Sequence, residues 1–168
     1  MLLFKGDGRK RCQKRLTKKF DILKKETLPN SLTTQLHVPG DPKFLSLIRR
    51  ILGASAIHLG LPVKILDDIK LAVTEACTNV IKHAFKYDNS KNFSIIIFFS
   101  KDFFCGNVSY IDTSFHPDEI LPPDLSHIRE GGLGVFIMRS IMDEVKYSVD
   151  TQTGKIVLKM VKNFVSSQ

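Results

Sequence analysis

The sequence predicts a two-layer α+β domain, in which a mostly antiparallel sheet is covered on one face by about three helices. Segments with strand periodicity and segments with helix periodicity follow one another in the order β-α-α-β-β-loop-α-β-β, without internal repeats. Two pairs of strand segments are joined by short polar turns, which is typical of antiparallel hairpins. The chain has 168 residues, of which 43% are hydrophobic and 25% are charged, and this composition fits one globular domain.

The first half of the folded region is predicted to hold one strand and two helices. Apolar and polar residues alternate over 32–38, which is the period of a half-buried strand. Asp41 and Pro42 then predict the start of a helix, as its N-cap and its first helical residue, and Gly60 predicts its end. A second series of apolar residues at helical spacing predicts a helix over 62–85.

The second half is predicted to contain two hairpins. Residues 93–99 are β-branched and aromatic, so they are expected to form a buried strand. Lys101 and Asp102 can turn this strand into a second one over 103–111. A closing hairpin is predicted from the strand segments 145–149 and 155–161.

The excess of positive charge lies in the N-terminal 25 residues. They hold ten Lys and Arg against two Asp, a local net charge of +8, and the remaining 143 residues are neutral overall. A DNA-binding domain carries its basic patch on the folded body, so direct binding of nucleic acid is not expected. Contact of this arm with nucleic acid or anionic lipid, and a simple solvated extension, both stay open. We expect 1–30 to be a poorly ordered basic extension and 31–168 to be the folded domain.

Three observations bear on the compartment. No apolar run approaches the ~20 residues that a helix needs to cross a bilayer. The N-terminus has no apolar segment before its charges, so it does not resemble a secretory signal. Three cysteines are too few and too scattered for a disulfide framework or a metal clip. The sequence therefore predicts a cytoplasmic protein that does not enter a membrane.

Three polar residues of the second predicted helix are spaced by four. Glu75, Asn79 and His83 therefore lie on one helical face, away from the apolar stripe. A carboxylate, an amide and an imidazole placed in this way can polarise a hydroxyl, ligate a hard cation and reach a phosphate. A solvated helix face gives the same pattern, so the spacing alone leaves both interpretations open.

A glycine-rich segment precedes the third predicted helix, which is expected to follow Gly134. The sequence over 130–134 is EGGLG, and glycines there let backbone N–H groups approach an anion at the positive end of a helix dipole. The segment matches neither a Walker A motif nor a GxGxxG turn, and a flexible joint would have the same composition. The preceding residues 112–130 contain three prolines and no periodicity, and they are a candidate lid.

Taken together, two segments resemble a known family. LAVTEACTNVIKHAFK over 71–86 resembles the N-box of the GHKL ATPase superfamily, in particular of its bacterial anti-sigma-factor serine/threonine kinases. EGGLGVFIMRSIMDEV over 130–145 resembles the glycine-rich second box of the same kinases. The two motifs stand in the family's order, about 45 residues apart, and the resemblance covers 31–162 but not the basic arm.

The resemblance implies a role for each motif residue in a site for ATP and Mg2+. Glu75 matches the general base, Asn79 matches the ligand that holds Mg2+ to the ATP phosphates, and His83 matches a polar position beside those phosphates. Residues 116–130 would form the lid. The backbone that wraps the phosphates would come from Gly131, Gly132, Leu133 and Gly134.

The resemblance also implies partners and a regulatory function. Kinases of this family phosphorylate a STAS-domain anti-anti-sigma protein on serine or threonine, and they otherwise hold a sigma factor inactive, which is called partner switching. The sigma-binding surface is expected on the first helix around Arg49 and Arg50. A homodimer stays open. The alternative is a contact-only regulatory module with the same fold and a degenerate nucleotide site.

One segment departs from the family pattern. Relatives carry an Asp-x-Gly segment whose aspartate accepts a hydrogen bond from the adenine amino group. An alignment anchored on Phe115 puts Tyr110 at the aspartate and Asp112 at the glycine. A shift of two residues makes Asp112 the adenine acceptor and puts Ser114 at the glycine. Asp112 is the first carboxylate after Asp102, so we predict that it accepts from adenine.

Overall fold

The computed structural model describes residues 31–112 and 132–164. In chain order, this part contains β1 (Leu32–Pro39), α2 (Phe44–His58), α3 (Val63–Asn79), a π-helical turn η1 (Val80–Ala84), β2 (Asn92–Phe99), β3 (Phe103–Ile111), α4 (Gly132–Ile141), β4 (Glu144–Asp150) and β5 (Lys155–Asn163). The order of strands and helices is the predicted one.

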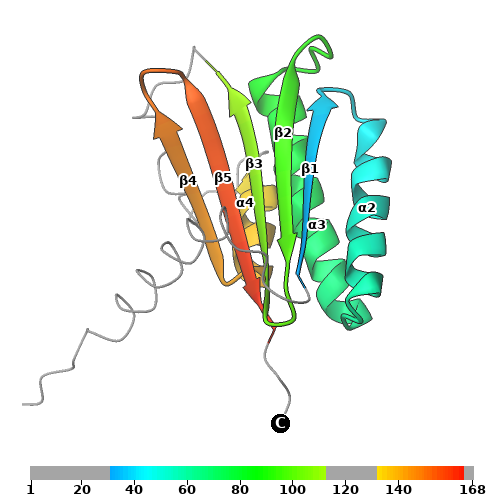
Figure 1. Ribbon diagram of the computed structural model, residues 1–168. Helices are drawn as coiled ribbons and strands as arrows, with labels where there is room; N and C mark the ends of the chain where they lie inside the picture. Colours follow the sequence, from blue (N-terminus) through cyan, green and yellow to red (C-terminus); the bar gives the residue numbers. More distant parts are fainter. Residues whose placement is uncertain (1–30, 113–131, 165–168) are drawn as a thin grey trace, which may run out of the picture.

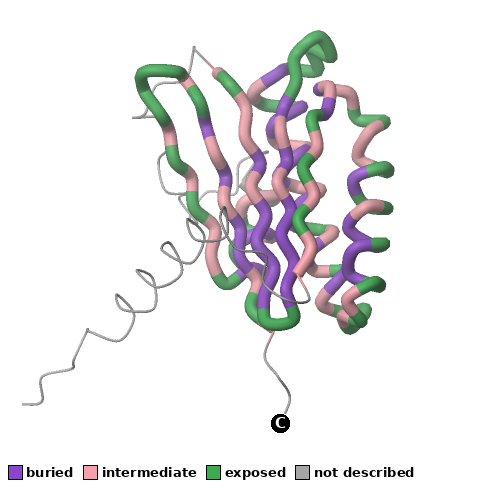
Figure 2. The backbone as a smooth tube through the Cα atoms, viewed as in Figure 1, coloured by how far each residue is buried: buried purple, intermediate pink, exposed green. Residues whose placement is uncertain are grey.

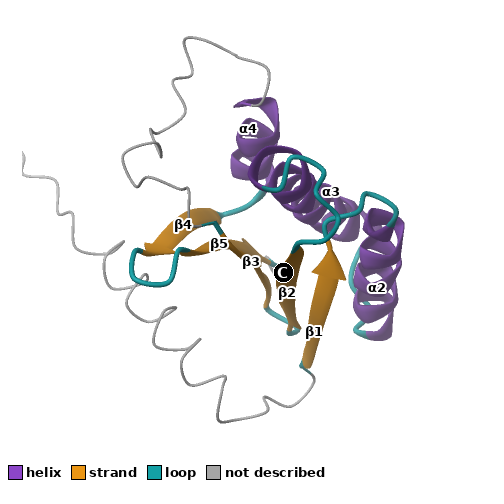
Figure 3. Cartoon of the chain, turned by 90° about the horizontal axis from the view of Figure 1, so that it is seen from above, coloured by secondary structure: helices purple, strands orange, loops and turns teal. Residues whose placement is uncertain are grey.

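The strands form one sheet with the order β1-β2-β3-β5-β4, in which every neighbouring pair is antiparallel. All three α-helices lie on the same face of this sheet, with α3 between α2 and α4 (Figure 1, Figure 3). The two-layer α+β prediction is therefore confirmed. The crossover that puts β5 between β3 and β4 brings the closing hairpin next to the middle of the sheet.

The main core lies between the sheet and the helices (Figure 2). In β2, alternate residues face the helices, and Phe93, Ile95, Ile97 and Phe99 are at most 1% exposed. Burial of each such side chain stabilises the fold by about 1.5–3 kcal/mol. The helices contribute their own buried stripes, namely Ile48 and Leu52 of α2, Ile69, Ala72, Val73 and Ala76 of α3, and Met138 of α4.

The start of the first helix differs from the prediction. α2 begins at Phe44, and its N-cap position is Lys43, which makes no side-chain capping bond. Asp41 instead accepts a hydrogen bond from the backbone N–H of Lys43 at 2.9 Å, and its other carboxylate oxygen lies 2.8 Å from the Lys43 ammonium. These bonds lower the pKa of Asp41. The carboxylate thus closes the turn before the helix rather than capping the helix itself.

The second predicted helix is continuous in space but changes its type. The α-helix ends at Asn79, and residues 80–84 form a π-helical turn, in which the Phe85 N–H donates to the Val80 carbonyl at 2.9 Å. Lys86 and Tyr87 then adopt positive φ values of 51° and 64°, in a backbone region that residues other than glycine rarely occupy. The prediction of one regular helix over 62–85 was therefore wrong in its last turn, because apolar spacing does not distinguish the two helix types.

The third helix begins three residues earlier than predicted, at Gly132 instead of directly after Gly134. Gly132, Leu133 and Gly134 form the first turn of α4 instead of a loop before it. The first four N–H groups of a helix have no acceptor within the helix, so this turn still presents backbone donors in its helical form. Gly131, the candidate lid over 116–130, Ser114 and Phe115 lie outside the described residues, as does the basic extension 1–30.

Candidate functional site

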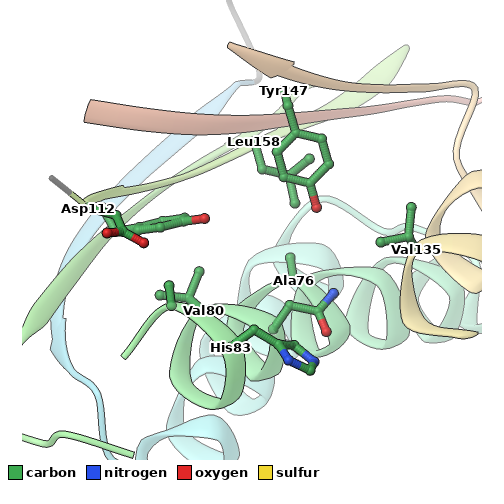
Figure 4. A pocket seen from close by; sticks show the side chains of 10 residues that line it. Ala76, Val80, His83, Asp112, Val135, Tyr147 and Leu158 are labelled. Carbon is green, nitrogen blue, oxygen red and sulfur yellow. The ribbon is translucent and has the colours of Figure 1, made fainter. Parts of the chain in front are cut away.

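A cavity of about 320 Å3 lies between the helix layer and the strands β3, β5 and β4 (Figure 4). Its wall on the helix side comes from the end of α3, from η1 and from the first turns of α4. Its apolar lining includes Ala76, Val80, Val135 and Leu158. Its polar lining consists of Asn79, His83, Tyr110, Asp112 and Tyr147.

Three of the predicted site residues meet in this cavity. Asn79 is the last residue of α3, His83 lies in η1, and Asp112 directly follows β3. The Asp112 backbone N–H donates to the Gly154 carbonyl at 2.9 Å, which joins the end of β3 to the turn between β4 and β5. The strand register therefore positions a carboxylate across the cavity from the helix.

Glu75 lies beside the cavity, one turn before Asn79 on α3, and it contacts the start of α4. A Cβ atom placed on Gly134 would be 2.8 Å from the Glu75 Oε2 and 3.4 Å from the amide atoms of Asn79. A distance of 2.8 Å is shorter than carbon–oxygen contacts allow, so a side chain at position 134 would force the Glu75 carboxylate to move. The two sequence motifs thus meet directly, through Gly134.

Tyr110 and Tyr147 add two phenol groups to the cavity. Burial, together with smaller effects of the nearby Tyr147 and Asp112, raises the pKa of Tyr110 to about 12. Burial also raises the pKa of Tyr147, although Arg139 opposes this shift. Both phenols are therefore neutral near pH 7, and each can donate and accept hydrogen bonds.

Sequence reasoning missed Tyr147, Leu158 and Val135 as members of the site. For Tyr147, the alternation of its strand could have indicated an inward-facing side chain, because Tyr147 shares the inward face of β4 with Val145 and Val149. Their distance from the motifs along the chain concealed their place in the fold. β5 inserts beside β3, which carries Tyr147 and Leu158 to the cavity.

The remaining predicted residues lie elsewhere. Gly132 and Leu133 are in the first turn of α4, and Leu133 is 55% exposed. Arg49 and Arg50 are exposed on α2, at the other side of the helix layer from α4. The structure therefore does not bring this arginine pair to the cavity.

The described part of the chain has neither a metal-binding cluster of acidic, histidine and cysteine residues nor a membrane-spanning helix. No group of three His, Cys, Asp or Glu residues in 31–112 and 132–164 could hold a metal ion. Over the same part of the chain, each helix is too short or too polar to span a membrane.

The chain combines a helical layer on an antiparallel sheet with a cavity between a polar helix face and a glycine-bearing helix start. Residues 38–162 match the family model described as histidine kinase-like ATPase domain. Curated relatives named serine-protein kinase RsbW are also similar to this chain. The relative from Listeria monocytogenes serovar 1/2a is 33% identical over 143 residues, covering 80% of this chain and 90% of its own length. The relative from Bacillus subtilis strain 168 is 34% identical over 120 residues, covering 67% and 75%.

The chain therefore belongs to the histidine kinase-like ATPase family, and within it to the serine-protein kinases that these relatives represent. The family resemblance that the sequence motifs indicated is therefore confirmed. The prediction that the chain is an ATP-dependent protein kinase is confirmed as well.

Proposed function

We propose that this protein is an anti-sigma factor that transfers the γ-phosphoryl group of ATP to a serine or threonine of a STAS-type anti-anti-sigma protein. In its other state it holds a sigma factor inactive, so that phosphorylation switches partners and regulates transcription in the cytoplasm. One observation carries the proposal: in a member of this kinase family, Asn79 and Asp112 line one cavity, and Glu75 lies at its side, against Gly134.

The residues around the cavity fit an ATP molecule. A volume of about 320 Å3 lies within the range of small-molecule sites. The first turn of α4 offers backbone N–H groups to the phosphates, and Gly134 has no side chain in the way. At the other end of the cavity, the Asp112 carboxylate can accept a hydrogen bond from the adenine amino group.

The same cavity fits one Mg2+ ion bound together with the nucleotide. The amide oxygen of Asn79 would hold it, and Mg2+ usually takes one or two protein oxygens and completes its shell with phosphates and water. Bound there, Mg2+ would neutralise phosphate charge during transfer.

Glu75 is the group that we assign to proton transfer. It precedes Asn79 by one helical turn on the same face, so it lies next to the phosphate end of the cavity. Its carboxylate would take the proton of the acceptor hydroxyl as the hydroxyl oxygen bonds to the γ-phosphorus. The bond from that phosphorus to the bridging oxygen breaks, and ADP leaves. Catalysis would rest on positioning and charge neutralisation.

The direct test uses the full chain, Mg-ATP and the cognate STAS protein. We expect mass spectrometry to find one added phosphoryl group on a serine or threonine of the STAS protein. In size-exclusion chromatography, the sigma factor should elute with this chain until unphosphorylated STAS protein is added. The same elution volumes report whether the chain is a homodimer. No phosphoryl transfer to the STAS protein would contradict the kinase proposal.

A contact-only regulator is the second candidate. It is favoured by Tyr110, which lines the cavity and which one alignment puts at the position of the adenine-binding aspartate, because a phenol is not a charged acceptor.

The two candidates share one prediction about the surface that binds the sigma factor. Arg49 and Arg50 are exposed on α2 beside the half-exposed Leu47, a mixed charged and apolar surface suited to a protein partner. We expect Arg50→Glu to weaken sigma binding at least tenfold and to leave ATP affinity unchanged, as measured by calorimetry. Unchanged sigma binding in both Arg49→Glu and Arg50→Glu would place the partner surface elsewhere.

Asp112→Asn separates the two candidates. The amide is a weaker, neutral acceptor, so the affinity for ATP should fall about ten- to a hundredfold, while sigma binding stays as it was. Asp102→Asn is the matched control, because Asp102 is exposed at the opposite end of β3. Wild-type ATP affinity in Asp112→Asn would assign the adenine contact to Tyr110 instead.

Gly134→Ala tests the contact between α4 and Glu75. The new Cβ would displace the Glu75 carboxylate, which is the end of a flexible side chain, so the fold should tolerate the change. Alanine also favours a helix over glycine by about 1 kcal/mol. We therefore expect the Tm to be unchanged or higher, with phosphoryl transfer reduced at least tenfold. A Tm that falls by more than a few degrees would mean that the contact is structural.

A further inference from the structure

The sheet has a second apolar cluster on its outer face, which is the face away from the helices. Its members are Phe98 of β2, Phe103 and Cys105 of β3, and Val161 of β5. The register puts Cys105 opposite Phe98 on one side and opposite Val161 on the other, so these three side chains share one face of the sheet. The rings of Phe98 and Phe103 lie beside each other, with centroids 5.4 Å apart. These four residues are called the outer cluster below.

The outer cluster is buried although the helices lie on the other face of the sheet. Phe98, Phe103 and Cys105 are 5%, 7% and 1% exposed. Among the described residues, all three α-helices pack on the opposite face (Figure 3). An antiparallel sheet with one uncovered face turns that face to water, so the neighbouring strands alone would leave the two rings exposed. The burial therefore indicates that a further segment lies on the outer face.

Polar groups beside the outer cluster are buried as well. Lys159 of β5 and Glu144 of β4 form an ion pair on this face, and their side chains are only 18% and 16% exposed. The Oδ1 atom of Asn107 on β3 is buried and has no hydrogen-bond partner within the described residues. On an open sheet face, long polar side chains extend into water. The cover therefore extends beyond the four apolar residues, toward β4.

Three stretches of the chain lie outside the described residues, and two of them are poorly placed to form this cover. Residues 165–168 are only four, with the sequence VSSQ. Residues 113–131 leave the fold at Asp112, at the end of β3 that is remote from Phe103, and they return at the first residue of α4, on the helix side.

Residues 1–30 join the fold beside the outer cluster. They lead into β1, whose first residue Leu32 pairs with Phe99, the direct neighbour of Phe98. Thirty residues are also enough to cross the sheet, because an eight-residue strand such as β2 is about 27 Å long. A helix over 11–28 would have the same length of about 27 Å.

The sequence of this segment has the pattern of an amphipathic helix. Apolar residues recur at spacings of four, four and three, which puts them on one narrow face: Cys12, Leu16, Phe20 and Leu23. Lys and Arg occupy most of the other positions, and neither glycine nor proline interrupts 11–28. Pro29 then predicts the end of the helix before β1 begins.

We propose that residues 11–28 form an amphipathic helix that lies on the outer cluster, with its apolar face against the sheet. The sheet is then enclosed between two helical layers, and the Lys and Arg residues of the segment face the solvent. The added layer lies outside the residues 38–162 that match the family domain. The basic arm is thus part of the folded body, and the outer face is closed to a second copy of the chain.

The test uses Cys105 as a reporter of the cover in the full chain. Burial raises the pKa of the Cys105 thiol to about 12, so a covered thiol reacts slowly with N-ethylmaleimide. The double variant Leu16→Asp and Phe20→Asp puts two charges on the apolar face and should release the helix. We expect the labelling rate of Cys105, followed by peptide mass spectrometry, to rise by at least about tenfold.

The matched control is the double variant Lys18→Gln and Lys25→Gln. It lowers the net charge by the same two units on the opposite face of the proposed helix, so it should leave the labelling rate of Cys105 unchanged. Cys77 is buried in the main core and should react slowly in every variant, which shows that the domain is folded. An equal rise in the control variant, or an unchanged rate in the Asp variant, would overturn the proposal.

Two measurements on the wild type need no variant. Amide hydrogen exchange should be slow over 11–28, and fast exchange throughout this stretch would reject the helix. Labelling of Cys105 should stay slow when the protein is diluted to concentrations at which size-exclusion chromatography shows a monomer. Fast labelling in the dilute monomer would make a second copy of the chain the cover of the outer face. Neither result depends on ATP or on a partner, so each leaves the proposed kinase activity as it stands.

Discussion

The Glu75→Gln variant should transfer phosphate to the STAS protein ~10²–10⁴ times more slowly than the wild type, with ATP binding and the fold preserved. Glutamine has the size of glutamate, so the contact with the start of α4 stays filled. It cannot take the proton of the acceptor hydroxyl. The rate is measured in single-turnover reactions with saturating Mg-ATP, because binding and product release then do not limit it.

The control for this variant is Asp67→Asn, which removes an exposed carboxylate from the same helix. It should transfer phosphate at the wild-type rate. If Glu75→Gln also keeps that rate, Glu75 is a solvated helix residue, and the general base must be sought among other residues near the phosphates.

The Asn79→Ala variant should lose the magnesium-dependent part of ATP binding. The wild type is expected to bind ATP at least tenfold more tightly with Mg2+ than with a chelator, because the amide oxygen holds the ion against the phosphates. Alanine offers no such oxygen, so both conditions should give one and the same weak affinity in calorimetry. Alanine is also the residue that a helix tolerates best, so the fold should be preserved.

Asn92→Ala makes the same chemical change at the exposed start of β2 and should keep the full magnesium effect. An Asn79→Ala protein that still responds to Mg2+ like the wild type would exclude Asn79 as the ligand. A wild type that binds ATP equally well in both conditions would exclude a magnesium site in this cavity.

Much of the fold could be predicted because its signals are local. The alternation in 32–38 and the β-branched residues of 93–99 decide the strand type within a few residues, and both strands are found there. The shared placement of Glu75 and Asn79 was predictable because both residues belong to one helix face, while their roles stay predictions. Asp112 was reached through the family resemblance, and the strand register brings it to the same cavity.

The rest of the site depends on long-range geometry. Tyr147 and Leu158 reach the cavity only because β5 lies between β3 and β4, an order that the chain sequence does not state. The start of α4 at Gly132 was missed because glycine lowers helix propensity, and the close approach of Gly134 to Glu75 is a long-range contact that the local sequence does not reveal.

The π-helical turn has a consequence for the comparison of sequences. Asn79 and His83 face the same cavity from one continuous helix, but they lie on either side of the change from α to π geometry. A π turn holds one more residue than an α turn, and one residue corresponds to about 100° of rotation around the helix axis. In a relative whose helix stays regular, the residue equivalent in space to His83 is therefore displaced by one position in a gap-free alignment. The roles of residues up to Asn79 can be assigned between family members by counting positions in a sequence alignment. From Val80 onward, equivalent residues have to be found by superposing the structures.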